Sequence, residues 1–266
     1  MYIPKFIISN RILKNIGIIE ASREVIDNAP LLPFYEREFQ KDALIRSVHY
    51  GTHIEGNELN LNQAGEIIAG NEVFARDRDI QEVINYRKVI DLISDSGINS
   101  LKGKVDEYLI KKIHKLTVDR ILLPDKCGKY RKKQVVIRNS NTGEVSFRPP
   151  TEIEVPAQVS ELIAFINKFT EQDIHPVLKS GVVHYELARI HPFVDGNGRV
   201  ARALSTVILF IEGYDIRRFF SLEEYFDSDA NSYYRALQSV AENDGNLTYW
   251  LEYFTQGLAI EISKIK

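Results

Sequence analysis

The residue types and spacing of positions 191–202 are those of a phosphate-handling site. This stretch reads His-Pro-Phe-Val-Asp-Gly-Asn-Gly-Arg-Val-Ala-Arg. Gly196 and Gly198 open backbone conformations that residues with a Cβ avoid, so successive main-chain N–H groups can form an anion nest. A helix that begins near Gly198 would aim its unpaired N–H groups and the positive end of its dipole at the same point.

The charged side chains of this stretch suit the same chemistry. Arg199 and Arg202 are three residues apart, so they project from one helix face and can clamp phosphate oxygens bidentately. Asp195 offers a hard oxygen for Mg²⁺, which proteins usually hold with one or two carboxylates plus the phosphates of the substrate. His191, with an ordinary pKa near 6.5, is a natural general base.

At every specified position the stretch resembles the HPFx(D/E)GNGRxxR signature of Fic-domain proteins. The resemblance implies a mostly helical Fic fold with a β-hairpin flap. It also implies an enzyme that transfers a nucleotide monophosphate, usually AMP from Mg-ATP, to a hydroxyl side chain of a target protein. The resemblance implies that His191 is the general base and that Asp195 is the Mg²⁺ ligand. It implies that the anion hole is formed by Gly196, Asn197 and Gly198. The two implied phosphate clamps are Arg199 and Arg202.

A second resemblance lies upstream, in Thr52-His53-Ile54-Glu55-Gly56-Asn57. It is similar to the (S/T)xxxE(G/N) inhibitory helix of many Fic proteins, whose glutamate pairs with the second signature arginine and displaces the γ-phosphate of ATP. The resemblance therefore implies that Glu55 contacts Arg202 and that the enzyme is self-inhibited. The chain departs from the pattern at Gly51, where Ser or Thr is expected. The alternative is that Glu55 is an ordinary helix-surface charge.

A β-hairpin is the strongest β signal in the sequence. Two short runs, 134–138 and 145–147, flank Asn-Ser-Asn-Thr-Gly, a composition typical of hairpin loops. In Fic proteins a hairpin at a similar position forms a flap that holds the target backbone by strand addition. The resemblance assigns this docking role to Gln134, Val135, Val136, Ile137 and Arg138.

Two further features each have a functional and a structural interpretation. Tyr233 and Tyr234 resemble a Tyr-Tyr stretch that lies beside the adenine in the family, but they also fit core aromatics. His184 lies two helical turns before His191, so a metal cluster of His184, His191 and Asp195 is an alternative. We favour a structural His184, because further ligands are not obvious nearby.

Apolar periodicity predicts helices over most of the remaining chain. The expected helices cover 36–48, 61–68, 79–93, 104–121, 156–170, 232–242 and 248–262. In the helix over 36–48, one buried face is expected to hold Phe39, Ala43, Leu44 and Val48. Asn60 is the expected N-cap of the helix over 61–68. We expect a helical subdomain with the inhibitory motif over 1–97 and a catalytic domain with C-terminal helices over 98–266.

Bulk composition predicts a globular protein. The 266 residues are 44% hydrophobic and 27% charged, with a net charge of −3. Because basic stripes and long apolar runs are both missing from the sequence, we expect neither nucleic-acid nor membrane binding. The single cysteine, Cys127, and an N-terminus unlike a signal peptide indicate a cytoplasmic protein.

Other functions and partners stay open at this stage. The same site would suit a hydrolase that removes AMP from modified proteins, with Glu55 orienting water, or a non-catalytic, toxin-like nucleotide-binding module. The expected partners are ATP and a target protein that the sequence does not name. A different donor nucleotide and a homodimer are also open.

Overall fold

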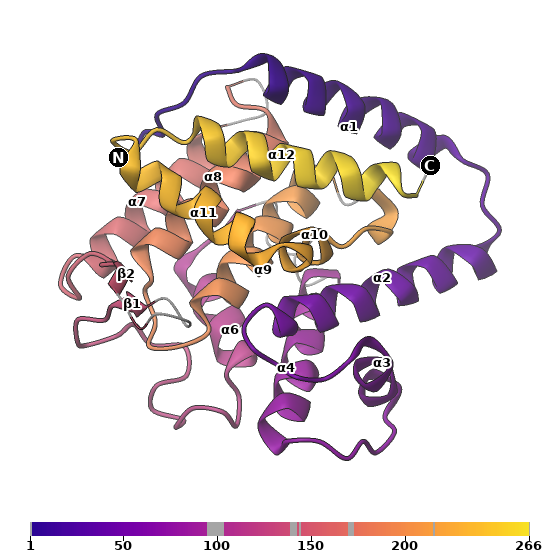
Figure 1. The fold of residues 1–266 in the computed structure, drawn as a ribbon, viewed down its shortest axis with the longest axis horizontal. Coiled ribbons are helices and arrows are strands. Elements are labelled where there is room, and N and C mark those ends of the chain that lie inside the picture. Colours follow the sequence, from indigo (N-terminus) through magenta and orange to yellow (C-terminus); the bar gives the residue numbers. More distant parts are fainter. Residues whose placement is uncertain are drawn as a thin grey trace.

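The computed structural model describes residues 2–94, 104–138, 143, 145–169, 173–214 and 216–265. The chain is mostly helical over these ranges, as predicted (Figure 1). The α-helices are α1 (Asn10–Asn28), α2 (Pro33–His53), α3 (Leu61–Ala69), α4 (Asp77–Ser94), α6 (Glu107–Thr117), α7 (Val155–Lys168), α8 (Pro176–Ile190), α9 (Asn197–Ile211), α10 (Leu222–Ser228), α11 (Ala230–Glu242) and α12 (Thr248–Ser263). A 3₁₀ turn, η1, covers Ile216–Arg218.

Helices α8 and α9 form the centre of the molecule. Most residues of both helices are buried, which is what a helix surrounded on all sides requires. The two helices pack closely, and Ser180 of α8 donates a hydrogen bond to the Ser205 carbonyl of α9 at 2.8 Å. Helices α7 and α12 cover α8, while α4 and α6 cover α9. The residues between these two central helices are the phosphate-handling stretch.

The N-terminal third wraps the central pair rather than standing apart. Helix α1 lies along α12, and α2 packs against α10 and α4 (Figure 1). The contact between α1 and α12 includes a buried hydrogen bond of 3.0 Å from the Asn15 amide to the Thr255 hydroxyl. One hydrophobic core joins residues from both ends of the chain. The expected boundary at 97/98 lies outside the described residues.

Several predicted helices are confirmed, and one of them, α3, begins with the N-cap that the sequence predicted. Helix α3 begins after Asn60, whose side chain accepts from the Gln63 N–H while the Gln63 side chain accepts from the Asn60 N–H. This reciprocal pair satisfies two donors that a helix start leaves unpaired. The helices predicted at 79–93, 156–170, 232–242 and 248–262 match α4, α7, α11 and α12 within two or three residues.

Two predicted helices have different ends. The helix expected over 36–48 runs from Pro33 to His53, and Phe39, expected on its buried face, is 47% exposed and packs edge-on to Phe219. The helix expected over 104–121 is only Glu107–Thr117. Asp106 caps its start, and turns follow its end, with Arg120 at a positive φ of 59°.

The predicted hairpin segment contains two short paired strands. Strand β1 (Ile137–Arg138) pairs antiparallel with β2 (Val145–Phe147), and Ile137 lies opposite Phe147. The first strand is shorter than the predicted run 134–138, and the expected loop at 139–142 lies outside the described residues. Among the residues that the structure describes, no helix has both the length and the apolar character needed to cross a bilayer.

Candidate active site

His191 lies where α8 ends and the phosphate-handling loop begins. Its N–H still donates to the Leu187 carbonyl at 3.0 Å, but its backbone is left-handed, with φ 50° and ψ 58°. Pro192 follows, and a residue before proline avoids the right-handed helical conformation. A non-glycine residue in the left-handed region is strained, and such strain is concentrated at functional positions. The end of α8 therefore turns His191 out of the helix.

The hydrogen bonds of His191 leave one ring nitrogen available as a base. Nδ1 lies 3.2 Å from the Ala188 carbonyl oxygen, which can only accept, so Nδ1 carries the proton of the neutral ring. Nε2 then keeps its lone pair. Burial lowers the pKa of His191 below its ordinary value, although the Ala188 carbonyl and the Glu55 carboxylate act against this shift. The ring is therefore neutral, and able to accept a proton, at neutral pH.

The loop after His191 is closed by the side chain of Asn197. Its amide donates to the Phe193 carbonyl at 2.9 Å, and its oxygen accepts from the Phe193 N–H at 2.8 Å. Gly196 precedes the helix with φ 77°, a conformation that favours glycine. Helix α9 begins at Asn197, which confirms the predicted helix start, and its first N–H groups have no partner within the helix. The main chain at 196–198 thus forms the open end of a helix dipole.

The two signature arginines lie on one face of α9 and are buried. The Nε atoms of Arg199 and Arg202 and the Nη1 atom of Arg202 are buried without a hydrogen-bond partner among the described residues. A buried donor without a partner is destabilising. These free donors, next to the open end of α9, fit a ligand that brings several oxygens, such as a polyphosphate.

Glu55 occupies the place where that anion would lie. It follows α2, and its Oε1 atom accepts from Nη2 of Arg202 at 2.8 Å. The same oxygen lies directly against Gly198, where a Cβ would overlap it. Burial opposes ionisation of Glu55, but the charges of Arg202 and Arg199 outweigh it and hold the pKa of this carboxyl below its ordinary value. The contact between Glu55 and Arg202 that the resemblance implied is confirmed.

The departure from the inhibitory pattern at Gly51 has a packing reason. The ring of Tyr86 lies against Gly51, and any Cβ there would overlap the ring. The Gly51 carbonyl accepts from Nη2 of Arg202 at 2.9 Å, so this position contacts the arginine through its backbone. Thr52, one place later, is buried, and its hydroxyl donates to the carbonyls of Val48 and His49 within α2.

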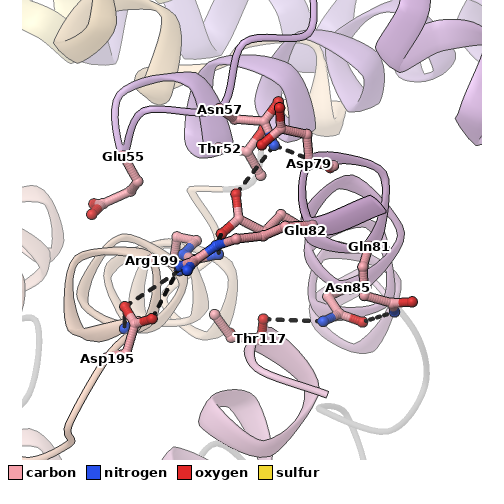
Figure 2. Close-up of polar contacts among 12 residues, drawn as sticks. Thr52, Glu55, Asn57, Asp79, Gln81, Glu82, Asn85, Thr117, Asp195 and Arg199 are labelled. Atoms are coloured by element: carbon pink, nitrogen blue, oxygen red, sulfur yellow. Dashed lines mark hydrogen bonds and ion pairs between the residues drawn. The ribbon is translucent and has the colours of Figure 1, made fainter. Parts of the chain in front are cut away.

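Asp195 is part of a ring of four charges around the start of α9. Arg199 lies between the Glu82 and Asp195 carboxylates (Figure 2), with N–O distances of 3.2 and 3.7 Å. Arg78 of α4 closes the ring, since its Nη2 lies 3.2 Å from Asp195 Oδ2 and its Nε lies 3.2 Å from Glu82 Oε1. Sequence reasoning identified Asp195 and Arg199 but missed Arg78 and Glu82, whose part depends on how α4 packs.

Asp195 is placed so that it could bind a divalent cation together with a nucleotide. His184 is not beside it, because its ring contacts Tyr233 in the core. The Asp195 side chain is 37% exposed at the mouth of the site, and its Oδ1 accepts from the Gly196 N–H at 2.6 Å. Within the described ranges, His, Cys, Asp and Glu side chains do not gather in a group of three or more that could hold a metal ion. Mg²⁺ bound with a polyphosphate does not require such a group.

The two tyrosines expected beside the adenine have different environments. Tyr233 is buried, and its hydroxyl lies 2.9 Å from Nε2 of His184 in an aromatic cluster with Phe226 and Trp250. In this arrangement the ring and hydroxyl of Tyr233 both make contacts within the core, and its contact with a nucleotide stays a prediction. Tyr234 is 41% exposed, and its hydroxyl donates to the Ile54 carbonyl at 3.3 Å, next to Glu55.

Two buried residues that sequence reasoning missed hold the loop in place. The Arg131 guanidinium donates to the carbonyls of His191 at 2.9 Å and Pro150 at 2.5 Å, so it ties the hairpin segment to the loop after α8. His114 of α6 stacks on Phe193 with ring centroids 3.7 Å apart, and its Nε2 lies 3.2 Å from the Asp195 carbonyl. Neither stands in a recognisable motif, so only their contacts show the role.

These features define a mostly helical protein in which the open start of α9, with buried arginines, lies next to His191. Residues 104–209 match the model of the Fic/DOC family, and this part of the chain is a Fic domain. The chain is 24% identical over 221 residues to the protein adenylyltransferase Fic of Nematostella vectensis, covering 79% of this chain and 48% of that protein. It is 26% identical over 184 residues to the protein adenylyltransferase fic-1 of Caenorhabditis elegans, covering 67% and 34%.

Solved structures show that the similarity of fold extends beyond the Fic domain. A Fic family protein from Desulfovibrio desulfuricans superposes with a TM-score of 0.82 at 26% identity, over 99% of this chain and 76% of that one. A Fic-domain signaling protein from Bacteroides thetaiotaomicron gives a TM-score of 0.77 at 22% identity, over 96% and 95%. The chain therefore spans half or less of the two curated relatives, but nearly all of the Bacteroides structure.

Proposed function

We propose that this protein is an adenylyltransferase that transfers AMP from ATP to a hydroxyl side chain of another protein, and that Glu55 inhibits it. One observation carries the proposal above the others. The carboxylate of Glu55 lies on the open start of α9 and pairs with Arg202, beside the neutral His191. The carboxylate of the protein itself thus lies at the point where the sequence predicts the phosphates of a nucleotide.

The proposed transfer uses His191 as the general base. The target hydroxyl attacks the α-phosphorus of ATP, a new P–O bond forms, and the bond to the β-phosphate oxygen breaks so that pyrophosphate leaves. The hydroxyl proton passes to Nε2 of His191, the nitrogen that its contact with Ala188 leaves unprotonated. Phosphoryl-type transfers depend mainly on positioning and on neutralising charge, which the start of α9 and its arginines supply.

The triphosphate would be held by the main chain of 196–198 and by Arg199 and Arg202. Their unpartnered guanidinium nitrogens are the donors available for it. Asp195 would hold the Mg²⁺ that accompanies the nucleotide and neutralises its charge. Tyr234, partly exposed beside the Glu55 turn, remains the candidate for contact with the adenine.

The hairpin is the proposed docking surface for the target. The segments that flank its two strands are tied to the loop after α8, because Arg131 contacts both His191 and Pro150. Gln134 joins the two arms of the hairpin segment by donating to the Pro149 carbonyl at 2.9 Å. An extended target segment could add to strand β1, residues 137–138, and so present its hydroxyl at a fixed distance from His191.

Labelled ATP tests the proposed reaction. Incubation of the Glu55→Gly variant with ATP labelled at the α-phosphate should label protein, whereas label at the γ-phosphate should remain in small molecules. Transfer of the γ-label without the α-label would indicate phosphorylation and contradict the proposal. Release of AMP from a premodified target, without forward labelling, would support the hydrolase. Tight ATP binding with neither reaction would support the non-catalytic module.

A further inference from the structure

The carboxylate expected to hold Mg²⁺ is already paired with a cation of the protein. Nη2 of Arg78 lies 3.2 Å from Oδ2 of Asp195, the oxygen that does not bind the Gly196 N–H. Arg78 comes from α4, a helix that lies 117 residues earlier in the chain. The pairing therefore brings a positive charge from the N-terminal third to the mouth of the site.

Arg78 is held in this position by Glu82, one helical turn further along α4. Glu82 is buried and also accepts from the Asn57 amide at 3.1 Å, two residues after Glu55 (Figure 2). The side chain of Arg78 is 61% exposed. It can thus leave Asp195 by rotation of its side chain, without repacking of the core.

The charges of the site balance without a ligand. The three guanidiniums of Arg78, Arg199 and Arg202 face the three carboxylates of Glu55, Glu82 and Asp195. Glu55 occupies the anion position at Arg202, and Arg78 occupies the cation position at Asp195. The N-terminal third therefore supplies both a carboxylate, Glu55, and a guanidinium, Arg78. Under the proposed function, the nucleotide phosphates would take the place of the carboxylate and the divalent cation that of the guanidinium.

We infer that Arg78 is a built-in competitor for the divalent cation at Asp195, acting alongside Glu55 as competitor for the phosphates. This inference rests on the proposed function, because it assigns a regulatory residue to the same site. Cation binding would require Arg78 to leave Asp195. A variant that lacks the Arg78 charge should therefore bind the cation more tightly while keeping the fold.

The expected gain is modest, because both partners are partly exposed. Exposed ion pairs contribute about 0.2–1 kcal/mol, and 1 kcal/mol is about a fivefold change in an equilibrium constant. Removing the Arg78 charge should then tighten cation binding by about 1.4- to fivefold. The gain should shrink as salt is added, because salt screens exposed charges.

Electron paramagnetic resonance of Mn²⁺ tests this without turnover. Mn²⁺ is titrated into the full chain saturated with α,β-methylene ATP, comparing wild type, Arg78→Gln, Asp195→Ala and the control Arg87→Gln. Arg87 lies on the same helix, but its carboxylate partner is Asp91, outside the site. We expect tighter Mn²⁺ binding only in Arg78→Gln, and weaker binding in Asp195→Ala.

The outcomes separate this inference from the proposed function. If Asp195→Ala weakens Mn²⁺ binding but Arg78→Gln matches wild type or binds more weakly, the role of Arg78 is wrong and the metal assignment stands. Equal gains in Arg78→Gln and Arg87→Gln would show a general charge effect and overturn the role as well. If Asp195→Ala binds Mn²⁺ like wild type, both the metal assignment and the role of Arg78 fail.

Discussion

His191 shows how a single residue gains its chemistry from its place in the chain. The helix end and Pro192 set its backbone, the Ala188 carbonyl fixes its protonated nitrogen, and burial keeps the ring neutral. The sequence predicted its role from the motif alone. It could not predict which ring nitrogen acts, because that depends on a hydrogen bond within the last turn of α8.

Replacement of His191 tests its role as base. His191→Ala should lower transfer by about 10²–10⁴-fold, the usual contribution of a positioned proton acceptor. ATP binding and the melting temperature should stay close to those of wild type, because the side chain contributes only one hydrogen bond. Rate, nucleotide affinity and thermal unfolding are measured in parallel. Transfer at the wild-type rate would remove His191 from the mechanism.

The pH dependence of transfer follows from the same residue. His191 must be neutral to accept a proton, and its pKa lies below the ordinary value because of burial. Transfer by a Glu55→Gly variant should therefore hold steady as the pH falls through the ordinary histidine range near 6.5, and decline only below it. A rate profile that declines above pH 7 on acidification would contradict this protonation state.

At the scale of elements, local signals predicted helices well and tertiary contacts poorly. Helix α3 carries its own cap in Asn60 and Gln63, so its start was predictable. Helix α1 was missed, because apolar residues lie on several of its faces and Gly17 interrupts its pattern. The sequence left Tyr233 with a nucleotide and a core interpretation, and its contact with His184, which the sequence does not reveal, places its side chain in the core.

The packing around two helical glycines predicts opposite effects of replacement by alanine. Gly51→Ala should lower the free energy of unfolding by about 1–3 kcal/mol, because the new Cβ overlaps the Tyr86 ring of α4. Gly17→Ala, at an exposed position of α1, should instead raise it by about 0.5–1 kcal/mol, since nothing lies near the new Cβ and alanine favours helix. Urea unfolding measures both, and a stabilised Gly51→Ala protein would contradict the packing explanation.

At the scale of the whole molecule, the N-terminal third and the Fic domain share one core, and both contribute residues to the candidate site. Helix α4 supplies Arg78 and Glu82, and the turn after α2 supplies Glu55. The sequence predicted the carboxylate and placed it in a helical subdomain over 1–97. The packing of α1 on α12 and of α2 on α10 and α4 depends on contacts far apart in sequence, which periodicity does not reveal.

Buried histidines predict how stability depends on pH. Burial lowers the pKa of five of the six histidines, and that of His114 falls to about 4; the five are His49, His114, His175, His184 and His191. The unfolded chain therefore binds more protons below pH 6.5, so stability should be fully present above this pH and decline toward pH 4. His114 alone would account for about 3 kcal/mol below pH 4.

Thermal unfolding of wild type and His114→Gln between pH 7 and pH 4.5 checks this dependence. Glutamine retains an acceptor for the Gly128 N–H, which donates to Nδ1 of His114 at 2.9 Å, but it does not titrate. The variant should lose less stability on acidification than wild type. An equal loss in both proteins would show that His114 does not carry the effect.

The most direct test of the central claim is intact-mass spectrometry of Glu55→Gly after incubation with Mg-ATP. Without the Glu55 carboxylate, Arg202 and the start of α9 are free to bind the phosphates of ATP. The variant should therefore add one or more adenylate groups to itself or to lysate proteins, whereas wild type should add few. Arg202→Ala should stay unmodified, because it also removes a phosphate clamp. The double variant should behave like Arg202→Ala, because both residues act through one contact. If Glu55→Gly and wild type show the same modification with a competent target present, the Glu55 carboxylate is not an inhibitor and the account fails.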